Sequence, residues 1–234
     1  MAADSRNVVQ LIADDLGLML GCYGLTAVRT PNIDKLAAQD TKFTNAFAST
    51  ASCSGSRSTI YTGLHTHQIG QYGLNHGWNH FQTHEHIETA PQIFNSLGYL
   101  TGIIGKVHVG PRSVYPWEWY APGETRNVRE VARQTGEFFN AAKNFNQTRP
   151  EEGSGIKMMT FETFHSQTTS RRMWTSAFSQ HIPELRTGLV EYYKAITRMD
   201  IGVGLIMNEL EMRGLHHNTL VIFISDNGSP FVNS

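Results

Sequence analysis

The chain has 234 residues, and its 19 lysines and arginines against 20 aspartates and glutamates give a formal net charge of -1. This length suits one large α/β domain with a sizeable core, while the near-neutral balance argues against a general polyanion-binding surface and hence against a nucleic-acid partner. Two cysteines are too few for a disulfide framework, and the first apolar run is too short for a signal peptide or a membrane span, so no membrane partner is expected and localisation stays unassigned.

A buried strand is predicted over residues 8–13, a short apolar and β-branched run that ends in Asp14 and Asp15. In open α/β sheets, ligands bind at the carboxyl ends of the parallel strands. Two adjacent carboxylates at that place repel each other, so they either face solvent or share a cation. A helix is then predicted over residues 32–38, opened by a proline, and residues 43–48 form a second strand-like run.

The next stretch, Cys-Ser-Gly-Ser-Arg at 53–57, predicts a turn that feeds a helix. Cys53 would then lie at the positive end of the helix, a position that lowers a thiol pKa and attracts anions. Arg57 adds a forked cation suited to a sulfate or phosphate group. The alternative is a small buried cysteine in a tight turn, and a bridge between Cys22 and Cys53 also stays open.

Six histidines occur between residues 65 and 86 without the ligand spacing of a zinc site, so most are expected at the surface or facing a substrate. A helix is predicted over 90–97 and a buried strand over 99–104. Directly after this strand, alternation places Lys106 and His108 on one face, between glycines. Such a pair suits an anion site, and the alternative is an edge strand with a solvated polar face.

The second half of the chain contains a long uninterpretable stretch between helical patterns. An amphipathic helix is predicted over 128–145, and a second, longer helix covers 183–213. Between them, residues 146–180 are polar and lack a clear period, so no strand is assigned there. A structureless loop of this length is unusual inside a compact domain.

The last predicted element is a strongly apolar strand over 219–224 that ends near Asp226 and Asn227. If this strand neighbours the one that ends at Asp14 and Asp15, four oxygen ligands converge at one edge of the sheet. Oxygen ligands without histidine favour Ca²⁺ or Mg²⁺ over zinc. A divalent cation there would offset the charge of a bound anion and polarise its oxygens.

Four of these motifs, taken together, resemble the sulfatase family. They are Leu-Ile-Ala-Asp-Asp at 11–15, Cys-Ser-Gly-Ser-Arg at 53–57 with Thr-Gly at 62–63, Gly-Lys-Val-His at 105–108 and Ser-Asp-Asn-Gly at 225–228. Within the family the chain is most similar to the sulfamidase branch, through Gly-Ile-Ile-Gly-Lys at 102–106 and Arg-Met-Asp at 198–200. The resemblance covers about residues 6–145 and 183–231.

This resemblance implies an alkaline-phosphatase-like α/β sandwich with a central, mostly parallel sheet flanked by helices. Residues 1–234 would form a partial N-terminal catalytic domain that lacks a central strand and a C-terminal subdomain. Residues 146–182 would be an atypical insert or a mis-spliced segment. Family members are typically lysosomal or secreted, a homodimer is compatible with the family, and no signal peptide is recognised here.

The resemblance also implies a chemistry. In sulfatases a formylglycine-generating enzyme oxidises the motif cysteine to formylglycine, whose hydrate attacks sulfur and later expels sulfate. The implied roles are cation ligation by Asp14, Asp15, residue 53, Asp226 and Asn227, support of the hydrate by Arg57, sulfate binding by Lys106, and proton transfer by His108. The cation would be Ca²⁺, with Mg²⁺ as the alternative. The implied substrate is a sulfated sugar or a glycosaminoglycan end, carrying a sulfuric ester or a sulfamate.

Two departures from the family pattern qualify this interpretation. The family consensus is Cys-x-Pro-Ser-Arg, and this chain carries Gly55 at the proline position. Residues 146–180 also contain no Asp-Pro-His segment, which family members carry after the central strand. Two alternatives therefore stay open: a phosphodiester or phosphonate hydrolase of the same superfamily, and an inactive truncated fragment.

Overall fold

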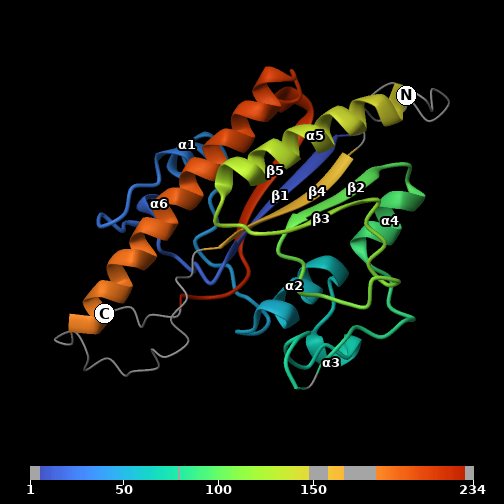
Figure 1. The fold of residues 1–234 in the computed structure, drawn as a ribbon, viewed down its shortest axis with the longest axis horizontal. Helices are drawn as coiled ribbons and strands as arrows, with labels where there is room; N and C mark the ends of the chain where they lie inside the picture. Colours follow the sequence, from blue (N-terminus) through green and yellow to red (C-terminus); the bar gives the residue numbers. More distant parts are fainter. Residues whose placement is uncertain (1–5, 79, 148–157, 166–182, 230–234) are drawn as a thin grey trace.

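The computed structural model describes residues 6–78, 80–147, 158–165 and 183–229, which fold around a five-stranded sheet (Figure 1). The strands are β1 (Asn7–Asp14), β2 (Leu100–Gly105), β3 (Trp119–Pro122), β4 (Met158–His165) and β5 (Thr219–Ser225). Their order across the sheet is β3-β2-β4-β1-β5, and every neighbouring pair is parallel. The predicted parallel α/β sheet is therefore confirmed.

Helices cover both faces of this sheet (Figure 1). They are α1 (Pro31–Gln39), α2 (Cys53–Thr62), α3 (Thr66–Ile69), α4 (Ala90–Ser96), α5 (Val128–Gln147) and α6 (Pro183–Met212), with short 3₁₀ turns at Gly21–Tyr23 and His216–Asn218. Helices α1, α5 and α6 pack on one face, and α2 and α4 pack on the other. Among the described helices, none combines the length and apolarity that a bilayer crossing requires.

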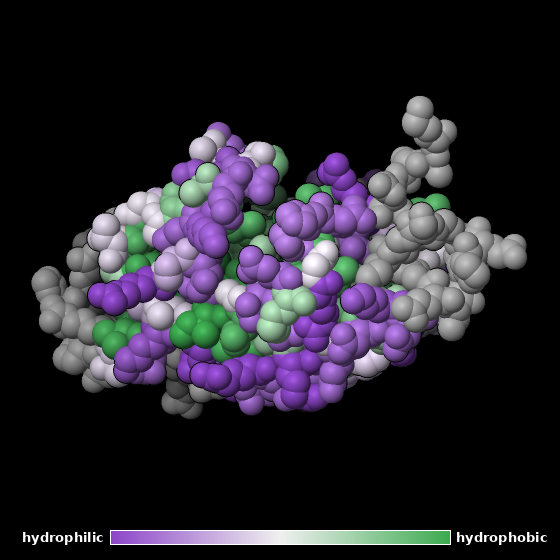
Figure 2. Space-filling model, turned by 90° about the horizontal axis from the view of Figure 1, so that it is seen from above, coloured by the Kyte–Doolittle hydropathy of each residue, from purple (hydrophilic) through white to green (hydrophobic). Residues whose placement is uncertain are grey.

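Strand β1 is buried on both sides, which explains its nearly continuous apolar sequence. Val9 and Leu11 face the α5 and α6 layer, where Phe138 and Ile196 are completely buried. Ile12 faces the opposite layer. The outer face of the molecule is mostly hydrophilic, with apolar residues confined to small patches in the view of Figure 2. Packing on both faces of β1 therefore fixes the position of its last residue, Asp14, at the carboxyl edge of the sheet.

The expectation that residues 146–182 lack a central strand is wrong. Strand β4 lies between β2 and β1, with a register that runs from Val8 opposite Met159 to Asp14 opposite His165. Its backbone thus satisfies hydrogen bonds of both neighbouring strands, which a gap would have left open. The sequence signal was weak because threonines and a glutamate interrupt the apolar run. The other residues of 146–182 lie outside the described residues.

The strand-like run at residues 43–48 is also a wrong prediction, because the structure assigns no strand there. Phe43 and Phe47 are 67% and 90% exposed. In contrast, the predicted helix over 183–213 is confirmed as one continuous element, α6. Its Gly204 is required for packing, since a Cβ at that position would lie 2.6 Å from the side chain of Asn32 at the start of α1. Helices α1 and α6 therefore approach closely.

Candidate active site

The predicted site residues converge at the carboxyl edge of the sheet. Asp14 ends β1, and Asp15 follows it with a φ of 55°, a left-handed conformation that aspartate tolerates better than most residues. Asp226 and Asn227 follow β5, the direct neighbour of β1. The backbone N–H of Asp15 donates a 2.9 Å hydrogen bond to Asp226 Oδ1. The predicted adjacency of the two strand ends is therefore confirmed.

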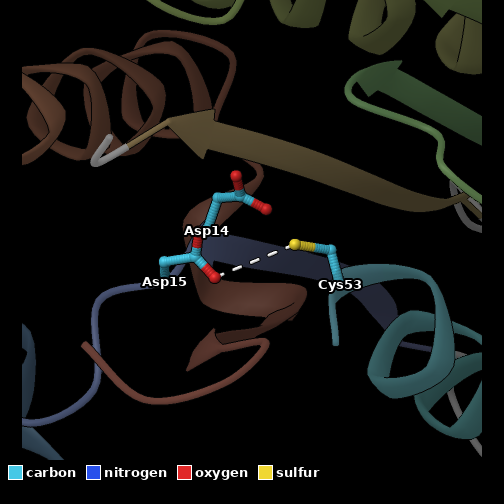
Figure 3. Close-up of side chains that lie close together, drawn as sticks. All are labelled: Asp14, Asp15 and Cys53. Carbon is cyan, nitrogen blue, oxygen red and sulfur yellow. Dashed lines mark hydrogen bonds between the residues drawn. The ribbon is translucent and has the colours of Figure 1, made fainter. Parts of the chain in front are cut away.

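Cys53 faces these strand ends from the first residue of α2 (Figure 3). Its Sγ lies 3.8 Å from Asp15 Oδ1 and 3.9 Å from Asn227 Nδ2. One ligand atom each from Asp14, Asp15 and Cys53 lies within 4.8 Å of the others. Carboxylate oxygens at this spacing fit a hard divalent cation such as Ca²⁺ or Mg²⁺. The two carboxylates supply such oxygen donors and the thiol sulfur does not, so the cation site stays a prediction.

The sequence predicts a lowered pKa for the Cys53 thiol, and this prediction is wrong. Burial, followed by the charge of Asp14, raises the pKa of Cys53 to about 12. The field of a helix start is small beside the cost of ionising a buried group next to carboxylates. The thiol is consequently a poor nucleophile in its unmodified form. No disulfide protects it, because Cys22 and Cys53 are both free.

Arg57 is completely buried and contacts the carboxylates of Asp14 and Asp226. Its Nη2 lies 3.1 Å from Asp14 Oδ1 and 2.9 Å from Asp226 Oδ2, and its Nη1 donates to the backbone oxygen of Lys106 at 3.3 Å. Burial raises the pKa of Asp226, and the adjacent positive charge of Arg57 opposes this shift. Arg57 therefore joins the ends of β1 and β5 and the segment after β2 through one planar group.

Lys106 and His108 lie in the segment after β2, which ends at Gly105, so they do not share one face of a strand as predicted. Lys106 Nζ contacts both oxygens of Asp14, at 2.6 and 2.8 Å. His108 has a φ of 52°, and its ring centroid lies 4.6 Å from that of His76. Within the described part of the chain, its buried Nδ1 has no hydrogen-bond partner. Burial and the nearby charge of Lys106 lower the pKa of His108 to about 3.

His108 should therefore make the fold sensitive to acid. Its pKa is about 3 in the folded chain against an ordinary value of 6.5. As the pH falls below 6.5, the unfolded chain takes up a proton that the folded chain does not, so the free energy of unfolding decreases. We expect His108→Gln to weaken this decrease between pH 6.5 and 4 in denaturant titrations. The matched change His86→Gln, at an exposed residue, should leave the fall in the free energy of unfolding unchanged. If both variants showed the same dependence of this free energy on pH, His108 would not be its source.

The six histidines between residues 65 and 86 lie at the surface, as predicted. All six are exposed, and within the described residues none joins the candidate cation cluster. Two further residues hold the site without any signal of this role in the sequence. The Tyr192 hydroxyl donates to the backbone oxygen of Asp15 at 2.8 Å, and Ser56 Oγ donates to the backbone oxygen of Asp226. Tyr192 looked like an ordinary core position of a helix, so its sequence carried no signal of this contact.

Comparisons with known proteins agree with this geometry. The family described as Sulfatase matches residues 6–233. Human N-sulphoglucosamine sulphohydrolase is 35% identical over 98% of this chain and 52% of its own length, and mouse iduronate 2-sulfatase is 41% identical over 52% of this chain and 22% of its own. The chain thus spans about half the length of the first of these relatives.

Solved structures show the same fold. The structure of Ps i-CgsB in complex with k-i-k-neocarrahexaose superposes with a TM-score of 0.76 at 21% identity, over 97% of this chain and 59% of that chain. PsFucS1 sulfatase from Pseudoalteromonas sp. gives a TM-score of 0.70 at 18% identity, over 98% and 59%. The family match, the curated relative and the arrangement of Cys53 beside paired aspartates agree. The chain belongs to the sulfatase family.

Proposed function

We propose that this chain forms the N-terminal part of a sulfatase catalytic domain that hydrolyses sulfuric esters or sulfamates of sugars. The observation that carries the proposal is the placement of Cys53 at the start of α2, with its sulfur beside the carboxylates of Asp14 and Asp15. The buried Arg57 one helical turn further on completes the motif. A phosphodiester hydrolase of the same superfamily stays the second candidate.

The relatives support a sugar substrate. N-sulphoglucosamine sulphohydrolase, which matches along 98% of this chain, is named for an N-sulfated sugar. Iduronate 2-sulfatase is named for a sulfated uronic acid. We therefore infer a sulfated sugar, at the end of a glycosaminoglycan chain, as the substrate. The first relative matches 98% of this chain and the second 52%, and this difference favours a sulfamate over a sulfuric ester as the substrate.

Sulfatases generally use a formylglycine and a divalent cation. A formylglycine at residue 53 would supply a hydrated aldehyde in place of a thiol that is hard to ionise. Asp14, Asp15, Asp226 and Asn227 would hold the cation, Ca²⁺ or Mg²⁺, through oxygen atoms. The ends of β1 and β5 lie side by side, and the backbone N–H of Asp15 is bonded to the carboxylate of Asp226, which supports a shared site for these residues.

The cationic and histidine side chains have complementary roles in this proposal. Arg57 would hold the carboxylates of Asp14 and Asp226 in place through its two ion pairs, and it supplies positive charge in the first half of α2. Lys106 reaches the same carboxylates from the segment after β2 and would bind a sulfate oxygen. His108 lies two residues further on, and within the described residues its buried Nδ1 has no hydrogen-bond partner; we assign it proton transfer to or from a reacting hydroxyl.

The decisive experiment is mass spectrometry of the peptide that contains Cys53, after co-expression with a formylglycine-generating enzyme. We expect the mass of formylglycine in part of the product, and an entirely unmodified thiol would contradict the proposal. Turnover of an aryl sulfate against an aryl phosphodiester separates the two candidate reactions. A cooperative thermal melt, followed by circular dichroism, tests whether the chain folds and so addresses the inactive-fragment alternative.

Gly55 gives a specific prediction for this conversion. We expect Gly55→Pro to raise the modified fraction of Cys53 several-fold, because proline restricts the unfolded segment toward one conformation. Gly55 lies in the first turn of α2, where proline is tolerated. The new Cβ would meet the methyl groups of Thr50 and Thr66 at 2.7 and 3.1 Å, so these side chains must shift. Quantitative mass spectrometry of the Cys53 peptide measures the effect.

Gly55→Ala is the matched control for that experiment. Alanine places a Cβ against the same two threonines but does not fix the backbone. It should therefore carry a similar packing cost, of about 1 kcal/mol, and leave conversion near that of the unaltered chain. Equal conversion of the proline variant and the unaltered chain would show that residue 55 does not limit the modification.

A further inference from the structure

The ammonium group of Lys106 lies against the carboxylate that would hold the cation. Its Nζ is 2.6 Å from Asp14 Oδ1 and 2.8 Å from Oδ2, so it contacts both oxygens. The Asp14 side chain is 1% exposed and that of Lys106 is 11% exposed, so water screens this pair poorly. Strand β4 separates β2 from β1, so Lys106 makes this contact across the width of one strand.

The two cations of the site differ in how firmly they are held. Arg57 is completely buried and is bound at once to Asp14, Asp226 and a backbone oxygen. The charge of Lys106 instead sits at the tip of a flexible side chain that is 11% exposed, where it contacts both oxygens of Asp14. A divalent cation that bound Asp14 would repel both, but of the two only Lys106 can turn away at low cost.

We propose that Lys106 is an internal competitor for the divalent cation at Asp14, and that its displacement couples cation binding to sulfate binding. This inference rests on the proposed function. Once a cation binds Asp14, the ammonium group is repelled from the carboxylate and becomes available to an anion. Linkage then requires that sulfate raises the affinity for the cation by the same factor as the cation raises the affinity for sulfate.

A purely structural role for Lys106 predicts something different. In that case, removal of the ammonium group would lower the thermal stability and weaken or preserve cation binding, because a salt bridge that orders Asp14 would be lost. Competition instead predicts tighter cation binding in a variant that lacks the charge. The two roles therefore differ in the sign of one measured quantity, the affinity for the cation.

The test is a calorimetric titration of the full chain with CaCl₂, with and without sodium sulfate at matched ionic strength. We expect Lys106→Met to bind Ca²⁺ about tenfold or more tightly than the unaltered chain, since a unit charge close to the ligand is removed. Sulfate should tighten Ca²⁺ binding by the unaltered chain by a larger factor than it does for Lys106→Met, in which only the direct attraction between cation and anion remains. Lys143→Met, which alters an exposed lysine of α5, should behave as the unaltered chain.

Lys106→Gln provides a second variant, since it keeps a hydrogen-bonding group beside Asp14 without the charge. It should reproduce the tighter Ca²⁺ binding, and thermal melts of every variant show that each is folded. If both Lys106 variants bind Ca²⁺ no more tightly than the unaltered chain, the competition is overturned while the proposed cation site stands. If no chain binds Ca²⁺ or Mg²⁺ at millimolar concentration, the cation of the proposed function fails, and the competition fails with it.

Discussion

Cys53→Ala should lower the turnover of a sulfated substrate by about ten-thousandfold or more, in protein co-expressed with a formylglycine-generating enzyme. Removal of a covalent nucleophile typically costs an effect of this size or larger. The side chain lies beside Asp15 and Asn227 in the candidate site, and the described residues hold no other cysteine there. Initial rates with an aryl sulfate or an N-sulfated glucosamine measure the change.

Cys22→Ala is the matched control for this experiment. Cys22 is the other free cysteine and lies in the 3₁₀ turn Gly21–Tyr23, where its backbone N–H donates to Asp34. Its removal should leave turnover within about twofold, because it contacts none of the carboxylates of the site. If Cys53→Ala kept the turnover of the Cys22→Ala chain, residue 53 could not be the source of the nucleophile.

Arg57→Met should reduce the free energy of unfolding by about 3–5 kcal/mol, the usual cost of removing one partner from a buried ion pair. Two buried carboxylates, Asp14 and Asp226, would lose the guanidinium that contacts both. For a chain of this size the midpoint of thermal unfolding should fall by roughly 6–20 °C. Denaturant and thermal unfolding, followed by circular dichroism, provide the measurement.

A double-mutant cycle distinguishes lost pairing from lost packing. Asp226→Asn removes one of the two charges that Arg57 neutralises, so the combined Arg57→Met and Asp226→Asn chain should be destabilised by less than the sum of the single changes. Arg57→Lys keeps the charge without the planar fork, so its free energy of unfolding should lie between those of the unaltered chain and of Arg57→Met. Strictly additive effects would show that the pairing of Arg57 with Asp226 contributes nothing to the stability of the fold.

Much of the site was predictable because strand ends carry clear signals. The apolar runs that form β1 and β5 stop abruptly at Asp14 and near Asp226, and an abrupt change of this kind marks the end of a buried strand. The turn into a helix at Cys53 was equally visible, since small polar residues occupy its first turn. These local patterns predict which side chains gather at the carboxyl edge of the sheet, and that they bind a cation stays a prediction.

The contacts within the site could not be predicted in the same way. Lys106 follows β2 and reaches Asp14 at the end of β1 across the intervening β4, and this contact depends on strand order, which is a property of the whole sheet. The raised pKa of Cys53 likewise depends on burial and on charges from distant segments. Sequence patterns describe neighbours along the chain, whereas these effects arise between neighbours in space.

The pairing of β1 with β5 has a consequence for the timing of synthesis. Val9 pairs with Val221, so β1 waits for a partner made more than 200 residues later, which takes roughly 10–40 s at ordinary rates of translation. Until then Asp226 cannot close over Ser56 and Arg57, residues that are buried in the finished fold. The order of synthesis thus leaves the segment around Cys53 uncovered by the end of β5 until that strand has been made.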